Sequence, residues 1–165
     1  MKTSIENLLA EIRRERERRR RPLPMQSPAS DEQLQKLAER MAELAYQLPA
    51  AYVEVLHVVN GIDSNGIVLY ASETQTLAAK AEHSDYTIEG VVEANLLWRD
   101  YPPNEQYIFF AESGDRLYCH NLVSGRFESV DRLTKELTYA PSSFATCEEL
   151  LELILNHMLD RYEEA

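Results

Sequence analysis

The chain has 165 residues, of which 44% are hydrophobic and 27% are charged, and this size suits one domain with one core. No apolar run approaches the roughly 20 residues that span a bilayer, and no secretory signal follows Lys2, so we expect a cytoplasmic protein without membrane contact. The net charge of −11 argues against a nucleic-acid partner, because an acidic surface repels phosphate.

Residues 1–21 are predicted to form an Arg-rich N-terminal helix. Thr3 and Glu6 have the spacing of a capping box. The apolar face that follows consists of Ile5, Leu8, Leu9 and Ile12. The sequence then continues RRERERRRR, which indicates a helix that begins docked and ends in solvent. The alternative is an arm that grips an acidic surface, either nucleic acid or the chain's own acidic body.

A Pro-rich linker, residues 22–30, is predicted to separate this helix from a single domain formed by residues 31–165. Ser30 with Gln33 forms a capping-box pattern, and the helix that it starts is expected to run to about Gln47. Its predicted buried stripe consists of Leu34, Leu37, Ala38, Met41, Leu44 and Ala45.

Residues 48–66 predict a helix, a sharp stop and a turn. Pro49 suits the first turn of a helix, because its fixed φ is already helical. The expected buried face consists of Tyr52, Val55, Leu56 and Val59. Asn60-Gly61 is a helix stop, and Asn65-Gly66 is a turn that leads into a strand over residues 67–71.

The rest of the chain predicts helices, then strands, then a helix. Residues 74–82 and 88–99 have helical patterns. Three strands are expected at 106–112, 116–122 and 126–130, joined by short Gly-containing turns, with a further short edge strand at 137–139. Thr146 with Glu149 caps the last helix. This order predicts an α+β fold, with a predominantly antiparallel sheet of about four to six strands covered by the N-terminal and C-terminal helices.

Residues 48–66 resemble the signature of the SUKH superfamily, which includes fungal regulators of cell-wall glucan synthesis and bacterial immunity proteins of polymorphic toxin systems. The positions that match are Leu48, Pro49, Tyr52, Val55, Leu56, Asn60, Gly61 and Gly66. The strand pair at 107–130 and the helix at 143–155 fit the same pattern, and Ile62 departs from it where the family often has glycine. The resemblance implies a SUKH-like α+β domain over about residues 31–159.

The sequence contains no named enzyme motif, and we expect neither catalysis nor a bound cofactor or metal. Cys119 and His120 are adjacent, but neighbours on a strand point to opposite faces and do not converge on one ion. Trp98 ends a predicted helix, where packing under the sheet is favoured over a role as an exposed anchor.

The resemblance implies a protein that binds and neutralises a cognate toxin, in particular a nuclease or another effector that modifies nucleic acid. Independently, an acidic body suits a basic protein partner, because complementary fields speed encounter. Binding residues concentrate on loops and strand ends. The candidate partner-binding residues are Asp63, Asp85, Tyr101, Glu105, Glu112, Asp115, Glu128 and Asp131. Two alternatives remain open: a regulatory adaptor that uses the Arg-rich helix for one partner and the body for another, and an enzyme of unrecognised type.

Overall fold

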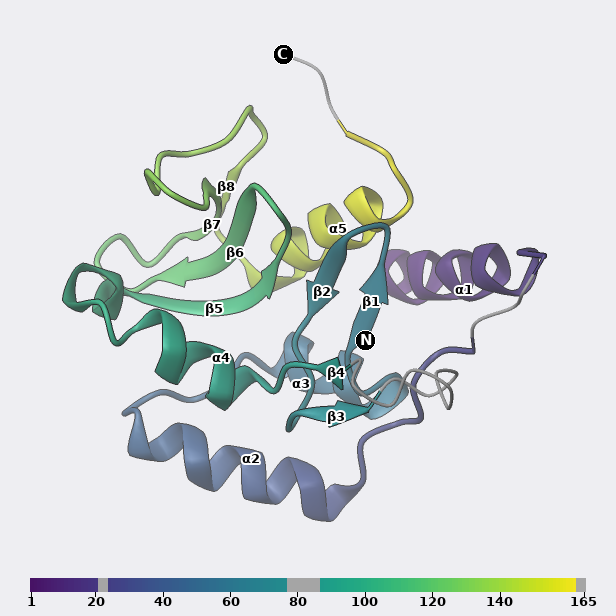
Figure 1. The fold of residues 1–165 in the computed structure, drawn as a ribbon, viewed down its shortest axis with the longest axis horizontal. Helices are drawn as coiled ribbons and strands as arrows, with labels where there is room; N and C mark the ends of the chain where they lie inside the picture. The colour runs from purple at the N-terminus through teal and green to yellow at the C-terminus, as the bar shows by residue number, and fades with distance from the viewer. Residues whose placement is uncertain (21–23, 77–86, 163–165) are drawn as a thin grey trace.

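A six-stranded antiparallel sheet, in the order β1-β2-β5-β6-β7-β8, is the centre of the computed structural model, which describes residues 1–20, 24–76 and 87–162 (Figure 1). The strands are β1 (Ile62–Ser64), β2 (Ile67–Leu69), β5 (Tyr107–Glu112), β6 (Arg116–Asn121), β7 (Phe127–Asp131) and β8 (Ser143–Phe144). A second, two-stranded sheet pairs β3 (Gln75–Thr76) with β4 (Thr87–Ile88). The predicted α+β class with an antiparallel sheet is confirmed.

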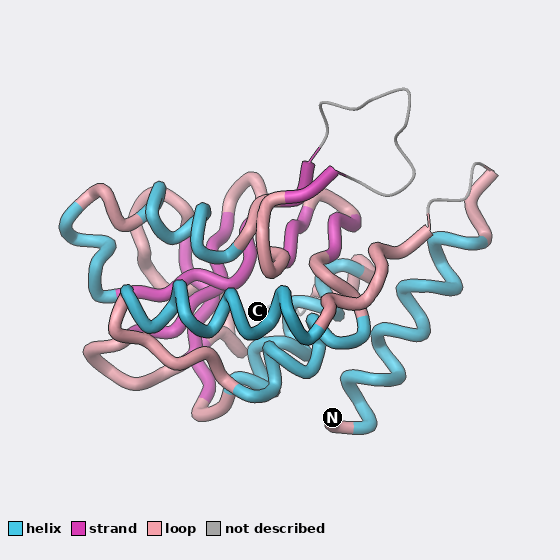
Figure 2. The backbone as a smooth tube through the Cα atoms, turned by 90° about the horizontal axis from the view of Figure 1, so that it is seen from below, coloured by secondary structure: helices cyan, strands magenta, loops and turns pink. Residues whose placement is uncertain are grey.

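Helices cover this sheet on more than one side. They are α1 (Thr3–Glu17), α2 (Asp31–Glu43), α3 (Ala50–Val58), α4 (Val91–Trp98) and α5 (Cys147–Met158), with a 3-10 helix η2 (Pro102–Gln106). α5 crosses the sheet against β2, β6, β7 and β8, and α1 and α3 pack on α5. Seen from below, α2 lies in front and α1 runs along one side (Figure 2). Within the described ranges, no helix is both long and apolar enough to cross a membrane.

α1 belongs to the same hydrophobic core as the rest of the chain. Ile5, Leu9 and Ile12 are buried in that core. Arg16, only 8% exposed, continues this docked face, and its Nη1 donates to the Asp63 carbonyl at 2.5 Å and to Ser64 Oγ at 3.0 Å. The helix therefore does not become solvated directly after Ile12, because an arginine from the charged run satisfies the edge of β1.

Both ends of α1 differ from the prediction. The N-cap residue is Lys2, with no side-chain capping bond, so the predicted Thr3–Glu6 capping box is wrong. The first turn is instead tied to α5, because Ser4 Oγ donates to Glu152 at 2.8 Å and Lys2 pairs with the same carboxylate. The helix ends at Glu17 rather than Arg21, which lies outside the described residues.

The predicted linker is held against α3 where the structure describes it. The Ala29 N–H donates to the Leu56 carbonyl at 2.9 Å, and the Asn60 N–H donates to the Ser27 carbonyl at 3.0 Å. Met25 and Ala29 are buried. Residues 24–30 are thus held on the body by these hydrogen bonds and buried side chains.

The stop after α3 forms as predicted. Gly61 has φ +88, and a Cβ there would lie 2.9 Å from Ala71 Cβ, so a larger residue is both strained and obstructed. Asn65 and Gly66 both have positive φ and connect Ser64 to its register partner Ile67, which makes a two-residue hairpin turn. The strand before this turn, β1, was not predicted, because Ile62–Ser64 is too short to show a period.

Several boundaries also differ. α2 ends at Glu43 rather than near Gln47, and α4 begins only at Val91, because Ile88 belongs to β4. The helix predicted at 74–82 is wrong at Gln75–Thr76, which forms β3, and its remainder from residue 77 lies outside the described residues. The edge strand predicted at 137–139 is also wrong. Leu137 makes only an isolated bridge to Val130, and the edge strand is β8.

Candidate functional site

An acidic hollow of about 360 Å³ opens beside the turn that joins β5 to β6 and the connection from β7 to β8. Its lining residues are Asp115, Arg116, Asp131, Thr134, Glu136, Leu137, Thr138 and Tyr139. We call this set the acidic hollow. It brings together two of the candidate residues named from sequence, Asp115 and Asp131.

The β-ladder places these residues. Arg116 and Asp131 are register partners in the β6–β7 pair. The Arg132 N–H donates to the Asp115 carbonyl at 2.9 Å, which holds the β5–β6 turn against the end of β7. The Asp131 N–H donates to the Glu136 carbonyl at 2.7 Å, so the chain turns back and brings Glu136 to the same recess.

The Asp131 side chain both fixes the loop after β7 by hydrogen bonds and contributes negative charge to the hollow. Its Oδ1 accepts hydrogen bonds from the N–H groups of Leu133 and Thr134, both at 2.9 Å, as in an Asx turn. These two backbone hydrogen bonds lower the pKa of the Asp131 carboxyl, so the group stays ionised at neutral pH. The same turn presents Leu133 to solvent, where it is 89% exposed.

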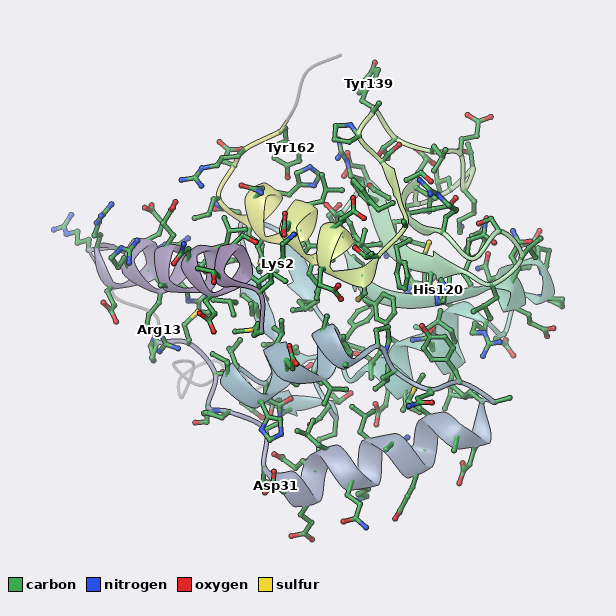
Figure 3. The ribbon with its side chains drawn as sticks, turned by 180° about the vertical axis from the view of Figure 1, so that it is seen from behind. Lys2, Arg13, Asp31, His120, Tyr139 and Tyr162 are labelled. Atoms are coloured by element: carbon green, nitrogen blue, oxygen red, sulfur yellow. The ribbon has the colours of Figure 1, made fainter. Side chains whose placement is uncertain are left out.

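The hollow combines negative charge with an apolar rim. Asp115 is exposed, and its Oδ1 accepts from Ser113 Oγ at 2.9 Å. The guanidinium of Arg116 lies 5.2 Å from the Tyr162 ring centroid, where a cation–π contact engages it. Leu137 is exposed and Tyr139 is 72% exposed. Figure 3 shows Tyr139 projecting at the opposite end of the molecule from Asp31 on α2. A lysine or arginine flanked by apolar groups fits this combination.

Glu112 lies near the hollow but is engaged internally. Its carboxylate pairs with Arg132 Nη1 at 2.7 Å and accepts from the Tyr70 hydroxyl at 3.1 Å. The Arg132 guanidinium also lies 4.8 Å from the Trp98 ring centroid, and Trp98 Nε1 donates to the Tyr70 hydroxyl at 3.1 Å. Trp98 is therefore packed, as favoured from sequence, and Glu112 joins β5 to a network of side chains.

The other candidate residues lie apart from the hollow. Asp63 is on β1, at the far edge of the sheet from β8. Tyr101 and Glu105 are exposed in or next to η2. Glu128 lies in β7 with Cys119 of β6 as its register partner, is only 8% exposed and accepts from Asn121 Nδ2 at 3.1 Å, so it is largely buried where a partner-binding residue was predicted. Asp85 lies outside the described residues.

Sequence reasoning missed Glu136 and Tyr139 as members of the hollow. Residues 137–139 were assigned to a strand, which hid the loop that presents them. A local signal existed, because Asp131 is followed by Leu133 and Thr134 in an Asx-turn pattern. No sequence pattern shows that this turn faces Asp115.

Buried thiols and histidines do not assemble a reactive centre in the part of the chain that the structure describes. Burial raises the pKa of the Cys147 thiol to about 12 and that of Cys119 well above its usual range, so both thiols stay protonated. His120 stacks on Phe127 at 4.1 Å between centroids and hydrogen-bonds to the Tyr46 hydroxyl at 2.8 Å. Within residues 1–20, 24–76 and 87–162, no three His, Cys, Asp or Glu side chains are grouped to hold a metal ion.

No protein-family model matches the sequence, and a search of curated proteins finds no significant match.

Proposed function

We propose that this protein is a non-enzymatic immunity protein that binds and neutralises a cognate, basic, nuclease-type bacterial toxin through the acidic hollow. A nuclease must be basic where it meets phosphate, and an acidic protein can occupy that surface. The resemblance of residues 48–66 to the SUKH signature supports the same class. A cytoplasmic location is part of this proposal.

The observation that carries the proposal is the acidic hollow. Asp115, Asp131 and Glu136 meet beside exposed Leu137 and Tyr139. High-affinity interfaces combine electrostatic attraction between the partners with aromatic or aliphatic side chains that become buried on binding. The net charge of −11 extends the same field over the molecule, which speeds encounter with a cationic partner and repels anionic ones.

One observation favours the adaptor as a second candidate. Beyond the docked face of α1, the arginines Arg13, Arg14, Arg19 and Arg20 are exposed, and they offer a cationic surface to an acidic partner. Deleting residues 1–22 does not test this role, because α1 contributes Ile5, Leu9 and Ile12 to the core. Replacing the exposed arginines with glutamine tests it without removing the helix.

The experiment begins with affinity capture from the native cells at low and high salt, followed by mass-spectrometric identification. We expect one stoichiometric basic protein that is toxic when expressed alone and harmless when co-expressed with this chain. Capture of acidic or non-toxic proteins only would remove the immunity proposal and favour the adaptor.

The captured partner then maps the surface. Glu136→Lys should slow association by about tenfold or more and reduce protection, because it reverses a charge inside the hollow. Glu43→Lys makes the same charge change at an exposed site on α2, outside the hollow, and should leave association within about twofold. Equal effects of the two reversals would show that net charge, not the hollow, determines binding.

A further inference from the structure

α2 exposes part of the apolar stripe that its sequence was expected to bury. Leu37 and Met41 are in the core, but Ala38 and Ala45 are exposed and Leu34 is only half buried. Ala42, which was not part of the expected stripe, is exposed as well. Leu34, Ala38 and Ala42 are spaced four residues apart and form one row along the helix. In the described structure this row faces an opening.

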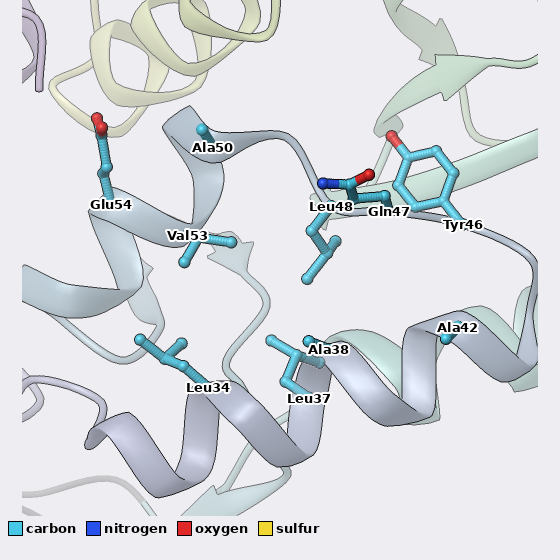
Figure 4. Close-up of a pocket in the computed structure, with 10 residues that line it drawn as sticks. All are labelled: Leu34, Leu37, Ala38, Ala42, Tyr46, Gln47, Leu48, Ala50, Val53 and Glu54. Carbon is cyan, nitrogen blue, oxygen red and sulfur yellow. The ribbon is translucent and has the colours of Figure 1, made fainter.

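The opening is an apolar groove of about 600 Å³ between α2 and the start of α3. Leu34, Ala38 and Ala42 line one wall, and Leu48, Ala50 and Val53 line the other. Figure 4 shows Leu34 and Ala38 facing Val53 and Leu48 across the space. The volume lies within the range of pockets that bind ligands.

Polar contacts on the other side of α2 hold the helix in place. Gln33 Nε2 donates to Glu73 Oε1 at 3.0 Å, and Arg40 Nη1 pairs with Glu93 Oε1 at 2.7 Å. Leu37 and Met41 are buried along the same helix. A shift of α2 toward α3 that closed the groove would break the contacts of Gln33 and Arg40 and expose buried side chains of α2. These contacts therefore keep the groove open.

The dimensions of the groove match a helix. From Leu34 to Ala42, the row spans eight residues, or about 12 Å at the helical rise. An amphipathic helix that docks through side chains at i, i+3, i+4 and i+7 presents anchors over roughly 10 Å. The two alanines let another helix approach closely, since interaxial distance depends on the side chains in contact.

The charges around the groove indicate which residues should flank the apolar face of the bound helix. Asp31 and Glu39 lie on the exposed part of α2 beside the row, and Glu54 lines the α3 side. Asp31 is 3.7 Å from His57 Nε2, yet its side chain is 97% exposed. Glu54 is 3.5 Å from the Met1 amine, and its side chain is 48% exposed. Arg40 points away toward Glu93. The rim is therefore acidic.

We propose that this groove binds an amphipathic helix of a protein partner whose apolar face is flanked by lysine or arginine. The inference goes beyond the toxin proposal and does not depend on it, because the groove and the acidic hollow have no lining residue in common. It assigns this chain a second interaction surface.

The test uses the full chain and a fluorescent synthetic peptide of leucine and lysine, about 18 residues long, with leucines at i, i+3, i+4 and i+7. Anisotropy titration should show saturable binding that weakens with salt. A peptide of the same composition, scrambled to abolish the apolar face, should bind at least about tenfold more weakly. Equal binding of the two peptides would overturn the proposal, because charge alone would then explain it.

Variants locate the binding site. Ala38→Trp fills the groove and Ala38→Lys places a cation in it, and each should weaken peptide binding by about tenfold or more. Ala38 is exposed on a helix, so circular dichroism should show both variants folded, and either one is sufficient. Ala145→Trp, at an exposed site between β8 and α5, should bind as wild type does.

Two results would replace the helix with another occupant. Concentration-dependent dimerisation in sedimentation, abolished by Ala38→Trp and without peptide binding, would assign the groove to a second copy of the chain. Binding of an apolar dye that Ala38→Trp abolishes, again without peptide binding, would assign it to a small apolar ligand. Either result overturns the helix proposal.

Discussion

Asn95 shows how one side chain takes the place of a strand. β2 pairs with β5 only at Glu112 and Ala111, so the Phe109 peptide lies beyond its reach. Asn95, which is fully buried on α4, accepts from the Phe109 N–H and donates to its carbonyl, both at 2.8 Å. Its Nδ2 also donates to the Val91 carbonyl at 2.8 Å. The amide thus continues the ladder and joins α4 to β5.

Replacing Asn95 with leucine should lower the free energy of unfolding by about 2 to 5 kcal/mol, because two buried groups of Phe109 lose their partner. Urea unfolding measures the loss. Asn156→Leu is the matched control, because Asn156 Nδ2 donates to the Glu152 carbonyl of its own helix and, within the described residues, makes no hydrogen bond to a strand. Its effect should stay below about 1 kcal/mol. Similar losses of unfolding free energy in both variants would show that the hydrogen bonds from Asn95 to β5 add no stability beyond that of an ordinary asparagine on a helix.

His157 is a buried histidine held neutral. It hydrogen-bonds to the Tyr118 hydroxyl at 2.8 Å and stacks on Tyr162 at 4.2 Å. Burial, with a smaller contribution from the charge of Arg116, lowers the pKa of His157 to about 4, and Asp115 opposes this shift. Below its unfolded pKa of about 6.5, the unfolded chain binds a proton that the folded chain does not.

Stability should therefore fall as pH drops from about 6.5 toward 4, with this histidine contributing about 2 to 3 kcal/mol of the loss. His157→Gln should reduce the difference in unfolding free energy between pH 7 and pH 4.5 by that amount. NMR titration of the His157 ring gives an independent reading. A folded-state midpoint near 6.5 would contradict the argument.

At the scale of elements, α1 combines two functions that the sequence suggested were separate. Its first three turns supply core side chains to α5, and Arg16 then satisfies the edge strand β1. An exposed strand edge invites pairing with other chains, and covering it prevents this. The arginine run is therefore partly structural, and Arg13, Arg14, Arg19 and Arg20 are exposed beyond this contact.

If α1 belongs to the cooperative core, Ile12→Ala should lower the free energy of unfolding by about 2 to 5 kcal/mol. The neighbouring exposed Arg13→Ala should change it by no more than about 0.5 kcal/mol. Urea unfolding, followed by circular dichroism and by the fluorescence of Trp98, should give one coincident transition for each protein. A separate early transition for helix loss would show that α1 unfolds on its own.

At the scale of the whole molecule, charge and apolar surface are distributed unevenly. In residues 1–22, Lys2 and seven arginines against four glutamates give +4, which leaves −15 for the rest. The strands β7 and β8 lie at one end of the molecule and α2 at the other (Figure 1). Residues of the β7–β8 connection line the acidic hollow, and residues of α2 line the apolar groove. The chain thus exposes an acidic hollow, an apolar groove and a cationic face of α1 at different places on its surface.

Local patterns in the sequence predicted the elements whose signal lies within a few residues. The capping boxes of Ser30 and Thr146 both form, as does the stop at Gly61. The hairpins between β5, β6 and β7 also follow their predicted order. Each of these depends on backbone conformations or hydrogen bonds that neighbouring residues provide.

The sequence patterns did not predict which residues from distant segments of the chain lie together in the fold. The sequence shows that Glu128 and Glu136 are acidic, but only the folded chain places them. Glu128 is buried within the paired strand β7, and the return of the chain after β7 brings Glu136 beside Asp115. Two-residue strands such as β8 exist only because β7 is there to pair with them.

The sequence by itself determined the α+β class, the capped helices and the acidic character, because propensity, turn chemistry and charge are local or additive properties. Only the tertiary structure decided that Arg16 covers β1, that Asn95 completes β5, and that α2 leaves an open groove. These features depend on contacts between residues far apart in the chain, and the physical interactions that select them act only once the chain is folded.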